Sequence, residues 1–498
     1  MDLSANLLRT MLGDGDIYRY NPWWARAGWE ADDPHLRRLR QRAVRLPAPQ
    51  VDALDLRRPA VHVMRGPRQV GKSTDLKLLV ARALRAGIDP RAIVYLSLDL
   101  LENRPASELV ATVGRALELA GVRSADAARL ILLDEVTITR DWRTAVKVLW
   151  DDGRIDADVV VCTGSSAIDL AEAAERLPGR RGAGRDILVL PRGFAAFAHA
   201  LDPEVPLGPG LTIAELLHQD GRAELERRRV HLPALRGLLE RYLLFGGLPA
   251  AVAEAATGAP EPSEEVRRVL WDALLREVQR RGASGAAAQA LMERIARSLG
   301  AKVSWSRIAR ELAVPLSGSR RRSAGAGGDD PRTVQGYVEM LAINYFALVL
   351  YFWRPDAGGG DLAKDKKIYF GDPLLRTITA ERVGLARDVH ADVENALALA
   401  LYRRYEPSER SAEGFPAPER LHVWGTRSGG EIDFVCGPRS AIEALEVADW
   451  VRVNRQKATG PMRALPGRPS LVATRDELSF TATANLVPAA LVLWALSG

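Results

Sequence analysis

Short apolar runs alternate with helix-like segments through residues 51–200 of the chain. The runs that we expect to form strands are 61–64, 93–98, 130–133, 159–162 and 187–190. Runs that are apolar at nearly every position are typical of strands covered on both faces of a sheet. Strands that alternate with helices predict a parallel sheet with crossover helices. We therefore predict an α/β fold with a parallel sheet for this region.

The pattern becomes helical beyond this region. Residues 215–284 predict a helical lid. Residues 285–355 predict three short helices followed by an apolar run, which is the element order of a winged helix-turn-helix, and Ser304 stands where it can cap the second helix. Residues 356–498 mix helices and strands and predict a small α/β domain. The Gly-rich stretch 356–360 predicts a linker at the start of that domain.

An N-terminal extension, residues 1–50, precedes the predicted sheet region, which we expect to span residues 51–214. The extension is rich in tryptophan, with Trp23, Trp24 and Trp29. The large apolar area of tryptophan favours packing against the neighbouring domain. A platform for a ligand is the alternative.

Composition sets limits on the class of protein. The chain has 498 residues, and at roughly 150 residues per domain this length predicts about three domains. The formal charge of +6 is mild, so it indicates nucleic-acid binding only where basic residues cluster. Cys162 and Cys436 lie far apart in apolar runs, which predicts buried free thiols and excludes a disulfide framework. We see no signal peptide and no apolar run near the ~20 residues that span a bilayer, so we expect a cytoplasmic protein without membrane contact.

One stretch predicts a phosphate-binding loop between a strand and a helix. It reads Gly66-Pro67-Arg68-Gln69-Val70-Gly71-Lys72-Ser73-Thr74. In this G-x-x-x-x-G-K-[ST] pattern the glycines let successive backbone N–H groups face an anion at a helix N-terminus. Lys72 would reach the β- and γ-phosphates of ATP, and the Ser73 hydroxyl would ligate Mg²⁺. A glycine turn that only caps a helix is the alternative, but the complete motif in its strand–helix context favours a nucleotide site.

Two carboxylates follow the third predicted strand. Leu133 runs into Asp134 and Glu135, as in a Walker B motif. A parallel sheet would bring both carboxylates to the edge at which the phosphate-binding loop lies. Asp134 would hold Mg²⁺, and Glu135 would polarise the attacking water as a general base. A helix cap is the alternative reading of such a pair.

Further polar residues follow the last two strands. Thr163 and Ser165 stand at the end of the fourth strand, where their hydroxyls could sense the γ-phosphate, cap the next helix, or do both. Arg180 and Arg185 belong to a Gly-rich loop that could supply a cation to the transition state. That cation would act within the chain or on a neighbouring subunit of a homo-oligomer. A basic loop without a partner is the alternative.

These motifs, together with the segment 242–249, resemble a prokaryotic family of AAA-domain ATPases whose C-terminal half is a domain of unknown function. The resemblance covers nearly the whole chain, and the Phe-Gly-Gly-Leu-Pro part of that segment points to this family in particular. It implies ATP binding and hydrolysis with Mg²⁺. It also implies a winged helix-turn-helix and a restriction-endonuclease-like domain. It identifies no substrate.

The predicted winged helix-turn-helix, within residues 304–341, is a candidate contact for double-stranded DNA. A basic insertion at 317–328 could lie on phosphates, since clustered arginines bind the DNA backbone. The third helix offers Arg332 and Gln335 as readers of base edges. A spacer between domains that touches no DNA is the alternative.

The last domain carries carboxylates that resemble the metal site of restriction-endonuclease-like nucleases. Glu394 lies on a predicted helix, and Asp433 and Glu446 lie on two successive predicted strands. In such nucleases the carboxylates hold Mg²⁺ and a lysine orients the hydrolytic water. Ala448 stands at the position of that lysine, so we predict a degenerate nuclease-like domain retained for binding.

The chain as a whole predicts an AAA-type ATPase whose nucleotide state switches the placement of its C-terminal binding domains. Two alternatives remain open. One is a nuclease in which ATP licenses DNA cleavage, and the other is a switch that turns ATP over slowly and docks a protein partner.

Overall fold

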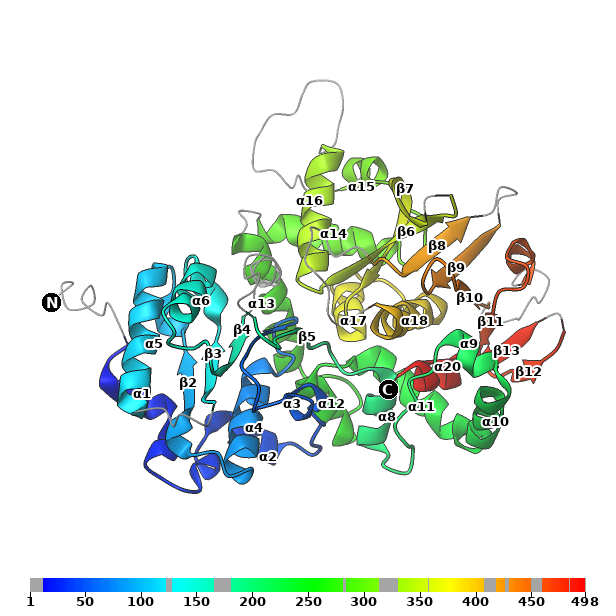
Figure 1. Ribbon diagram of the computed structural model, residues 1–498. Coiled ribbons are helices and arrows are strands. Elements are labelled where there is room, and N and C mark those ends of the chain that lie inside the picture. The colour runs from blue at the N-terminus through cyan, green and yellow to red at the C-terminus, as the bar shows by residue number, and fades with distance from the viewer. Residues whose placement is uncertain are drawn as a thin grey trace. The chain divides into compact units, whose positions relative to one another are not determined.

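A computed structural model describes most of the chain, in ranges separated by gaps. The described residues are 12–121, 128–164, 181–280, 284–312, 330–356, 358–406, 418–425, 430–448, 459–482 and 484–497. The chain divides into two compact units. Of the described residues, those up to Leu190 form the first unit and those from Pro191 onward form the second. Figure 1 labels the helices and strands of both units.

The first unit is built on a five-stranded parallel sheet with the strand order β2-β3-β4-β1-β5. The strands are β1 (Ala60–Arg65), β2 (Ile93–Ser97), β3 (Leu130–Asp134), β4 (Val159–Thr163) and β5 (Asp186–Leu188). Every residue of β1, β3 and β4 is buried, which explains their continuously apolar runs. The five predicted strands and the parallel α/β fold are confirmed.

Helices cover both faces of this sheet. On one face α5 (Ala106–Ala120) packs against α6 (Trp142–Asp151), and α4 (Lys72–Arg85) lies on the opposite face (Figure 1). Because all strands are parallel, the loop that follows β1 and the carboxylates that end β3 share one edge of the sheet. Only β4 separates them, which at the usual strand spacing is about 10 Å between β1 and β3.

The N-terminal extension covers the free edge of the sheet at β2. Its elements are α1 (Asp14–Tyr20), η1 (Pro22–Trp24), η2 (Trp29–Ala31), α2 (Pro34–Gln41) and α3 (Pro49–Asp52). The indole N–H groups of Trp23 and Trp24 donate to the carbonyl oxygen of Ile93, at 3.0 and 2.8 Å. Asn21 exchanges two hydrogen bonds with the backbone of Tyr95, at 2.9 and 2.7 Å. The tryptophans therefore pack on the neighbouring sheet, as predicted, and they also satisfy its edge strand.

The second unit begins with a group of helices. They are α8 (Phe194–Leu201), α9 (Ile213–Leu217), α10 (Gln219–Arg228), α11 (Leu232–Phe245), α12 (Pro249–Ala256) and α13 (Glu264–Arg280). The region predicted as a lid is therefore helical. Its helix α11 packs on α17 (Pro373–Arg382) and α20 (Ala489–Leu496), so the lid region shares one compact unit with the C-terminal region.

A glycine pair after α11 is held by a buried aspartate. Gly246 ends the helix with φ +68°, a conformation that favours glycine. Asp372 accepts hydrogen bonds from the backbone N–H groups of Gly247 and Leu374, both at 2.9 Å. A Cβ on Gly247 would lie 2.0 Å from the carbonyl oxygen of Arg192. Close backbone packing therefore requires glycine in this part of the Phe-Gly-Gly-Leu-Pro segment.

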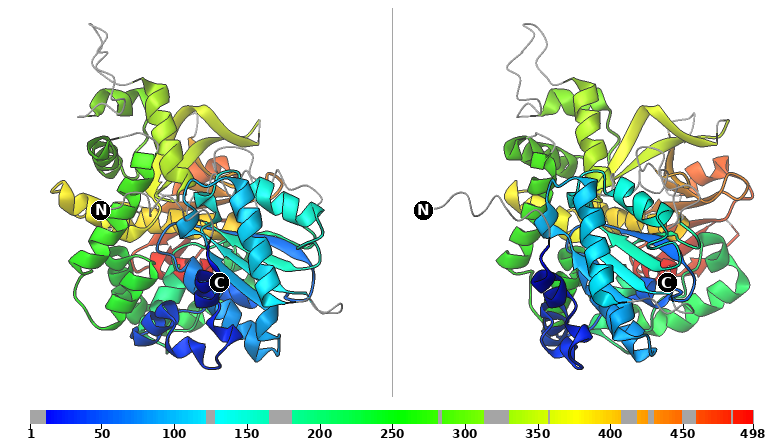
Figure 2. Two further views of the ribbon diagram at one scale, coloured as in Figure 1. Left: turned by 90° about the vertical axis from the view of Figure 1, so that its left-hand side faces the viewer. Right: turned by 60° about the vertical axis from the view of Figure 1, so that its left-hand side comes forward.

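Three helices follow in the predicted order, and a hairpin comes after them. They are α14 (Gly285–Arg297), α15 (Trp305–Glu311), α16 (Pro331–Ile343), β6 (Ala347–Arg354) and β7 (Gly359–Phe370). Ser304 caps α15 as predicted, accepting from the backbone N–H of Arg307 at 3.2 Å. β6 and β7 pair antiparallel, and Figure 2 shows their hairpin beside α16. The prediction of a linker at 356–360 is wrong. Gly358, at φ +68°, lies between the two strands of the hairpin, and β7 begins at Gly359.

The hairpin joins an eight-stranded sheet with the order β12-β13-β11-β10-β9-β8-β6-β7. The remaining strands are β8 (Leu421–Gly425), β9 (Glu431–Cys436), β10 (Glu443–Val447), β11 (Ser470–Thr474), β12 (Ser479–Phe480) and β13 (Asn485–Pro488). Next to it, α18 (Val389–Tyr405) buries every residue from Ala391 to Leu401. Cys162 and Cys436 are buried free thiols, as predicted. Within the described ranges, no helix is both long enough and apolar enough to cross a membrane.

Candidate functional site

The phosphate-binding loop joins β1 to α4 through two glycines. Gly66 has φ +154°, and a Cβ there would lie 1.9 Å from the carbonyl oxygen of Val189. Gly71 has φ +104° and is the N-cap residue of α4. Both positions therefore demand glycine. The loop ends at a helix N-terminus, where unpaired N–H groups and the helix dipole favour an anion.

Lys72 lies in the first turn of α4 and its ammonium turns back over the loop. Its Nζ donates to the carbonyl oxygens of Gly66 and Pro67, both at 2.9 Å. Burial lowers the pKa of Lys72, and the carboxylates of Glu135 and Asp134 oppose that shift. The predicted phosphate-binding lysine and the two predicted catalytic carboxylates thus interact within one site.

Both oxygens of the Asp134 carboxylate are held by hydroxyl groups. Oδ2 accepts from the hydroxyl of Tyr95 at 2.9 Å, and Oδ1 accepts from the hydroxyl of Thr163. Tyr95 lies on β2 and Thr163 ends β4, so strands on both sides of β3 orient this carboxylate. Tyr95 was not predicted, because a tyrosine within an apolar strand is typical of a core residue.

Glu135 follows β3 in a left-handed conformation, with φ +59° and ψ +41°. This conformation is uncommon outside glycine and is often found at functional sites. The backbone N–H of Glu135 donates to the hydroxyl oxygen of Thr163 at 3.3 Å. Thr163, predicted as a sensor or a cap, therefore contacts both residues of the Walker B pair.

The described part of the Gly-rich loop, residues 181–185, lies along the start of β1. Ser165 and Arg180 fall outside the described residues. The Nη2 atom of Arg185 donates to the carbonyl oxygen of Ala53 at 3.1 Å, and its backbone N–H donates to Nδ1 of His62 at 3.3 Å. This contact ties the guanidinium to the segment that precedes β1 in the chain.

A buried cation that was not predicted lies behind Tyr95. The Nζ of Lys77 is 3.3 Å from the ring centroid of Tyr95 and 5.2 Å from that of Trp23. It is also 3.8 Å from a carboxylate oxygen of Asp33. Burial lowers the pKa of Lys77 to about 8, against the opposing charges of Asp33 and Asp134. This group connects the N-terminal extension to the Walker B aspartate through Tyr95.

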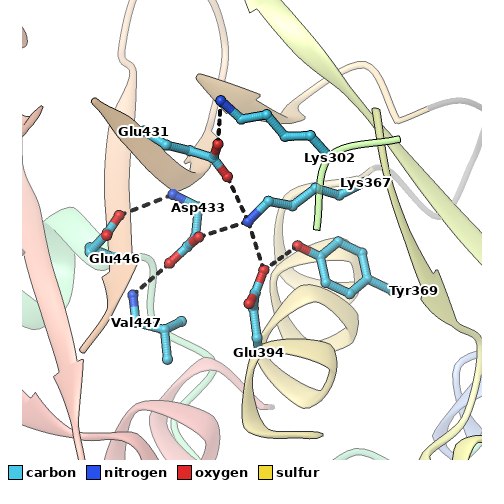
Figure 3. A network of polar contacts seen from close by, with 8 residues as sticks. All are labelled: Lys302, Lys367, Tyr369, Glu394, Glu431, Asp433, Glu446 and Val447. Atoms are coloured by element: carbon cyan, nitrogen blue, oxygen red, sulfur yellow. Dashed lines mark hydrogen bonds and ion pairs between the residues drawn. The ribbon is translucent and has the colours of Figure 1, made fainter. Parts of the chain in front are cut away.

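In the second unit two of the predicted carboxylates meet at an unpredicted lysine (Figure 3). The Nζ of Lys367 lies 2.9 Å from Oε1 of Glu394 and 2.8 Å from Oδ1 of Asp433. A third carboxylate, that of Glu431, lies 2.8 Å from the same nitrogen and pairs with Lys302 at 2.6 Å. These residues come from β7, α18 and β9, so only the tertiary fold brings them together.

The charges of this cluster shift the pKa values of its members. Burial alone would lower the pKa of Lys367, but the charges of Asp433 and Glu394 outweigh it and raise the pKa above its ordinary value. Burial, together with the charge of Asp433, raises the pKa of Glu394. The hydroxyl of Tyr369 donates to Oε1 of Glu394 at 2.7 Å. The ammonium of Lys367 therefore keeps its charge at neutral pH.

The third predicted carboxylate, Glu446, faces the backbone of β9. Its Oε2 accepts from the backbone N–H of Asp433 at 3.1 Å. Oδ2 of Asp433 in turn accepts from the backbone N–H of Val447 at 2.9 Å. Burial, followed by the charge of Asp433, raises the pKa of Glu446.

The cluster does not fit a Mg²⁺ site of the predicted kind. The ammonium of Lys367 occupies the space between Glu394 and Asp433, and Glu446 contacts a backbone amide. In the part of the chain that the structure describes, no group of three or more His, Cys, Asp or Glu side chains is placed to hold a metal ion.

Comparison with protein families matches two parts of the chain. Residues 58–197 match the family model described as an AAA domain, and residues 236–382 match one described as a domain of unknown function. The first range contains the phosphate-binding loop and the Walker B pair, so this part of the chain is similar to an AAA domain. Comparison with curated proteins finds no match.

Two solved structures align with large parts of the chain at low similarity. The Walker-type ATPase PABY2304 of Pyrococcus abyssi is 13% identical with a TM-score of 0.38, over 64% of this chain and 90% of that one. The ORC1 protein of Aeropyrum pernix, in complex with DNA, is 16% identical with a TM-score of 0.27, over 75% of this chain and 96% of that one. These TM-scores are too low to support an inference about this chain.

Proposed function

We propose that the first unit binds ATP with Mg²⁺ and hydrolyses it, and that its nucleotide state switches the C-terminal region. The observation that carries this proposal is the oriented carboxylate of Asp134. Hydroxyl groups of Tyr95 and Thr163 hold its two oxygens at the same sheet edge as the phosphate-binding loop. A carboxylate fixed in this way is preorganised for an electrostatic role beside a phosphate.

The loop supplies the phosphate contacts in this proposal. Backbone N–H groups at the start of α4 would bind the β- and γ-phosphates, and the ammonium of Lys72 would leave the carbonyl oxygens of Gly66 and Pro67 to contact them. Those two carbonyl contacts hold the ammonium over the loop until ATP binds.

The residues at this edge fit a magnesium ion. Ser73 and Asp134 offer hydroxyl and carboxylate oxygens, which are the donors that Mg²⁺ prefers, and Ser73 is partly exposed. When bound, the ion would neutralise charge on the phosphate oxygens. Ser73 and Asp134 would hold it, and the two hydroxyl contacts of Asp134 would keep that carboxylate in place.

Glu135 is the general base in this proposal. Its carboxylate would accept a hydrogen bond from the attacking water and orient it towards the γ-phosphate. The charge of Glu135 acts on Lys72, which supports a position close to the phosphates. Arg180 and Arg185 stay predictions as sources of a cation, and the contact of Arg185 with Ala53 does not support a role at the phosphates within the chain.

Measurement of ATP turnover and ATP binding on the full chain tests this assignment. We expect Glu135→Gln to lower kcat by about 10²- to 10⁴-fold, the usual contribution of a general base, while ATP binding is retained. We expect Lys72→Ala to abolish ATP binding. Glu118→Gln and Lys147→Ala, at exposed positions of the first unit, make the same chemical changes and should leave both measurements unchanged. If the Glu135→Gln variant hydrolyses ATP at the native rate, Glu135 is not the general base.

Double-stranded DNA is a second candidate ligand because of the three helices and hairpin formed by α14, α15, α16, β6 and β7. Arg332 is exposed on α16, whereas the amide of Gln335 donates to Glu339 at 2.7 Å. The basic insertion at 317–328 lies outside the described residues. An ATPase assay with and without DNA across a salt series tests this proposal, since stimulation through phosphate contacts must weaken as salt rises.

A further inference from the structure

We infer that the ammonium of Lys367 is the built-in cation of the carboxylate cluster in the second unit, so that the native cluster binds no divalent metal. This inference goes beyond the proposed ATPase function and rests on the second unit alone. The Nζ of Lys367 lies 2.8–2.9 Å from carboxylate oxygens of Glu394, Glu431 and Asp433 (Figure 3). Its side chain is only 2% exposed.

The strand β7 holds this ammonium in place. Lys367 pairs with Leu350 of β6 in the hairpin. Because side chains alternate along a strand, the neighbouring Lys366 points to the other face, where its Nζ lies 4.1 Å from the ring centroid of Trp305. Tyr369, two residues further along, returns to the cluster and donates to Glu394. The register of a paired strand therefore sets the position of Nζ.

The cluster leaves no place for a second cation. A divalent ion among the same oxygens would lie a few ångströms from the buried ammonium, at the cost of strong repulsion. The other carboxylate oxygen of Asp433, Oδ2, accepts a hydrogen bond from the backbone N–H of Val447. Glu446 accepts one from the backbone N–H of Asp433. A metal would have to displace Lys367, whose charge would then be buried without partners.

This arrangement bears on the alternative of an ATP-licensed nuclease. Without a metal there is no metal-activated water, and hydrolysis of DNA by this cluster would lack its main source of rate. The carboxylates are instead partners of Lys367 that tie β7, α18 and β9 together. Breaking a buried pair of this kind by removing one partner is costly.

Binding of Mn²⁺ to the full chain without nucleotide, measured by electron paramagnetic resonance, tests the inference. All variants carry Asp134→Asn so that the nucleotide site adds no signal. We expect no site in the protein that keeps Lys367. Lys367→Met frees three carboxylates, which suit Mn²⁺, and we expect it to bind the ion at least about tenfold more tightly. Lys302→Met, which removes the other lysine paired with Glu431, is the matched control and should create no site.

Further variants keep the inference testable if Lys367→Met is unstable. Lys367→Met combined with Glu394→Gln removes one negative charge along with the ammonium, and Mn²⁺ should raise its melting temperature but not that of the parent. Adding Asp433→Asn to either variant should abolish the effect. Tight Mn²⁺ binding by the parent that is lost in Asp433→Asn would overturn the inference. So would the absence of any Mn²⁺ effect on folded variants without Lys367.

Discussion

Tyr95 and Thr163 determine how the Walker B carboxylate is presented. Each hydroxyl takes one oxygen of Asp134, and both side chains come from neighbouring strands. Asp134 was predictable because it belongs to a local motif. Its partners were not, because their role depends on which strands lie next to β3.

Tyr95→Phe should weaken the function of Asp134 without removing it. The change leaves one buried carboxylate oxygen without its hydroxyl donor, which should cost about 1–3 kcal/mol of unfolding free energy. We also expect the Mg²⁺ concentration that gives half-maximal ATPase activity to rise, because the carboxylate is less well oriented. Tyr18→Phe, at an exposed position, is the control. If Tyr95→Phe loses the expected stability but its ATPase activity depends on Mg²⁺ as in the native chain, Tyr95 has a purely structural role.

His62 should make stability depend on pH. Burial, followed by the charges of Arg185 and Arg181, lowers the pKa of His62 from 6.5 to about 4. Between pH 4 and 6.5 the unfolded chain therefore binds more protons at His62 than the folded chain does, so this residue makes stability rise as pH rises.

Thermal unfolding at pH 4.5 and 6.5 checks this sign. His62→Asn keeps an acceptor for the backbone N–H of Arg185 but does not titrate, so its melting temperature should rise less between the two pH values than that of the native chain. His218→Asn, at an exposed position, should leave the rise unchanged. An undiminished rise in His62→Asn would contradict the prediction.

At the scale of elements, the edge of the first sheet is closed by the N-terminal extension. An open edge strand presents unpaired N–H and C=O groups to other chains. Here Asn21, Trp23 and Trp24 satisfy backbone groups of β2. The tryptophan content predicted packing, but which strand would be covered depended on the strand order.

Asn21→Ala should therefore expose the edge at Tyr95. The change removes both hydrogen bonds to the backbone of Tyr95 and a third to the carbonyl oxygen of Ile17. We expect a loss of about 1–3 kcal/mol in unfolding free energy. Urea unfolding measures the loss, and light scattering should show greater association of the variant. If Asn21→Ala unfolds at the same urea concentration as the native chain, the contacts of Asn21 do not stabilise the edge.

The hairpin of β6 and β7 shows where element prediction failed. A glycine-rich stretch after an apolar strand is compatible with a linker or with a tight turn, since glycine suits both. Because β6 pairs with β7, the glycine-rich stretch is a turn and not a linker, and Lys366 and Lys367 lie on a strand. The error about the linker therefore also hid Lys367 as a partner of the carboxylates.

At the scale of the whole molecule, nucleotide and mutation should each stabilise or destabilise mainly the unit in which they act. The phosphate-binding loop and the Walker B pair both lie in the first unit, and the glycine pair held by Asp372 lies in the second. A ligand stabilises the unit that binds it, by about 2.7 kcal/mol at a concentration of 100 Kd.

Differential scanning calorimetry tests this expectation. We expect two unfolding transitions, of which ATP with Mg²⁺ raises one and Lys72→Ala abolishes that shift. Gly247→Ala should lower the other transition, because its Cβ would meet the carbonyl oxygen of Arg192 and such overpacking costs about 1–3 kcal/mol. A single transition moved by both changes would show that the units unfold together.

The sequence by itself determined the phosphate-binding loop, the Walker B pair and the five parallel strands, because short segments encode them. Such local patterns indicate the same local structure in any fold. Examples are a glycine at a left-handed position, a lysine at the start of a helix and a strand that is apolar at every position. Only the tertiary structure decided what surrounds the charged groups. The partners of Asp134, and the lysine among Glu394, Glu431 and Asp433, come from strands and helices far apart in the chain. A carboxylate binds a metal or an ammonium according to which cation the fold brings to it, and that choice depends on strand order and register.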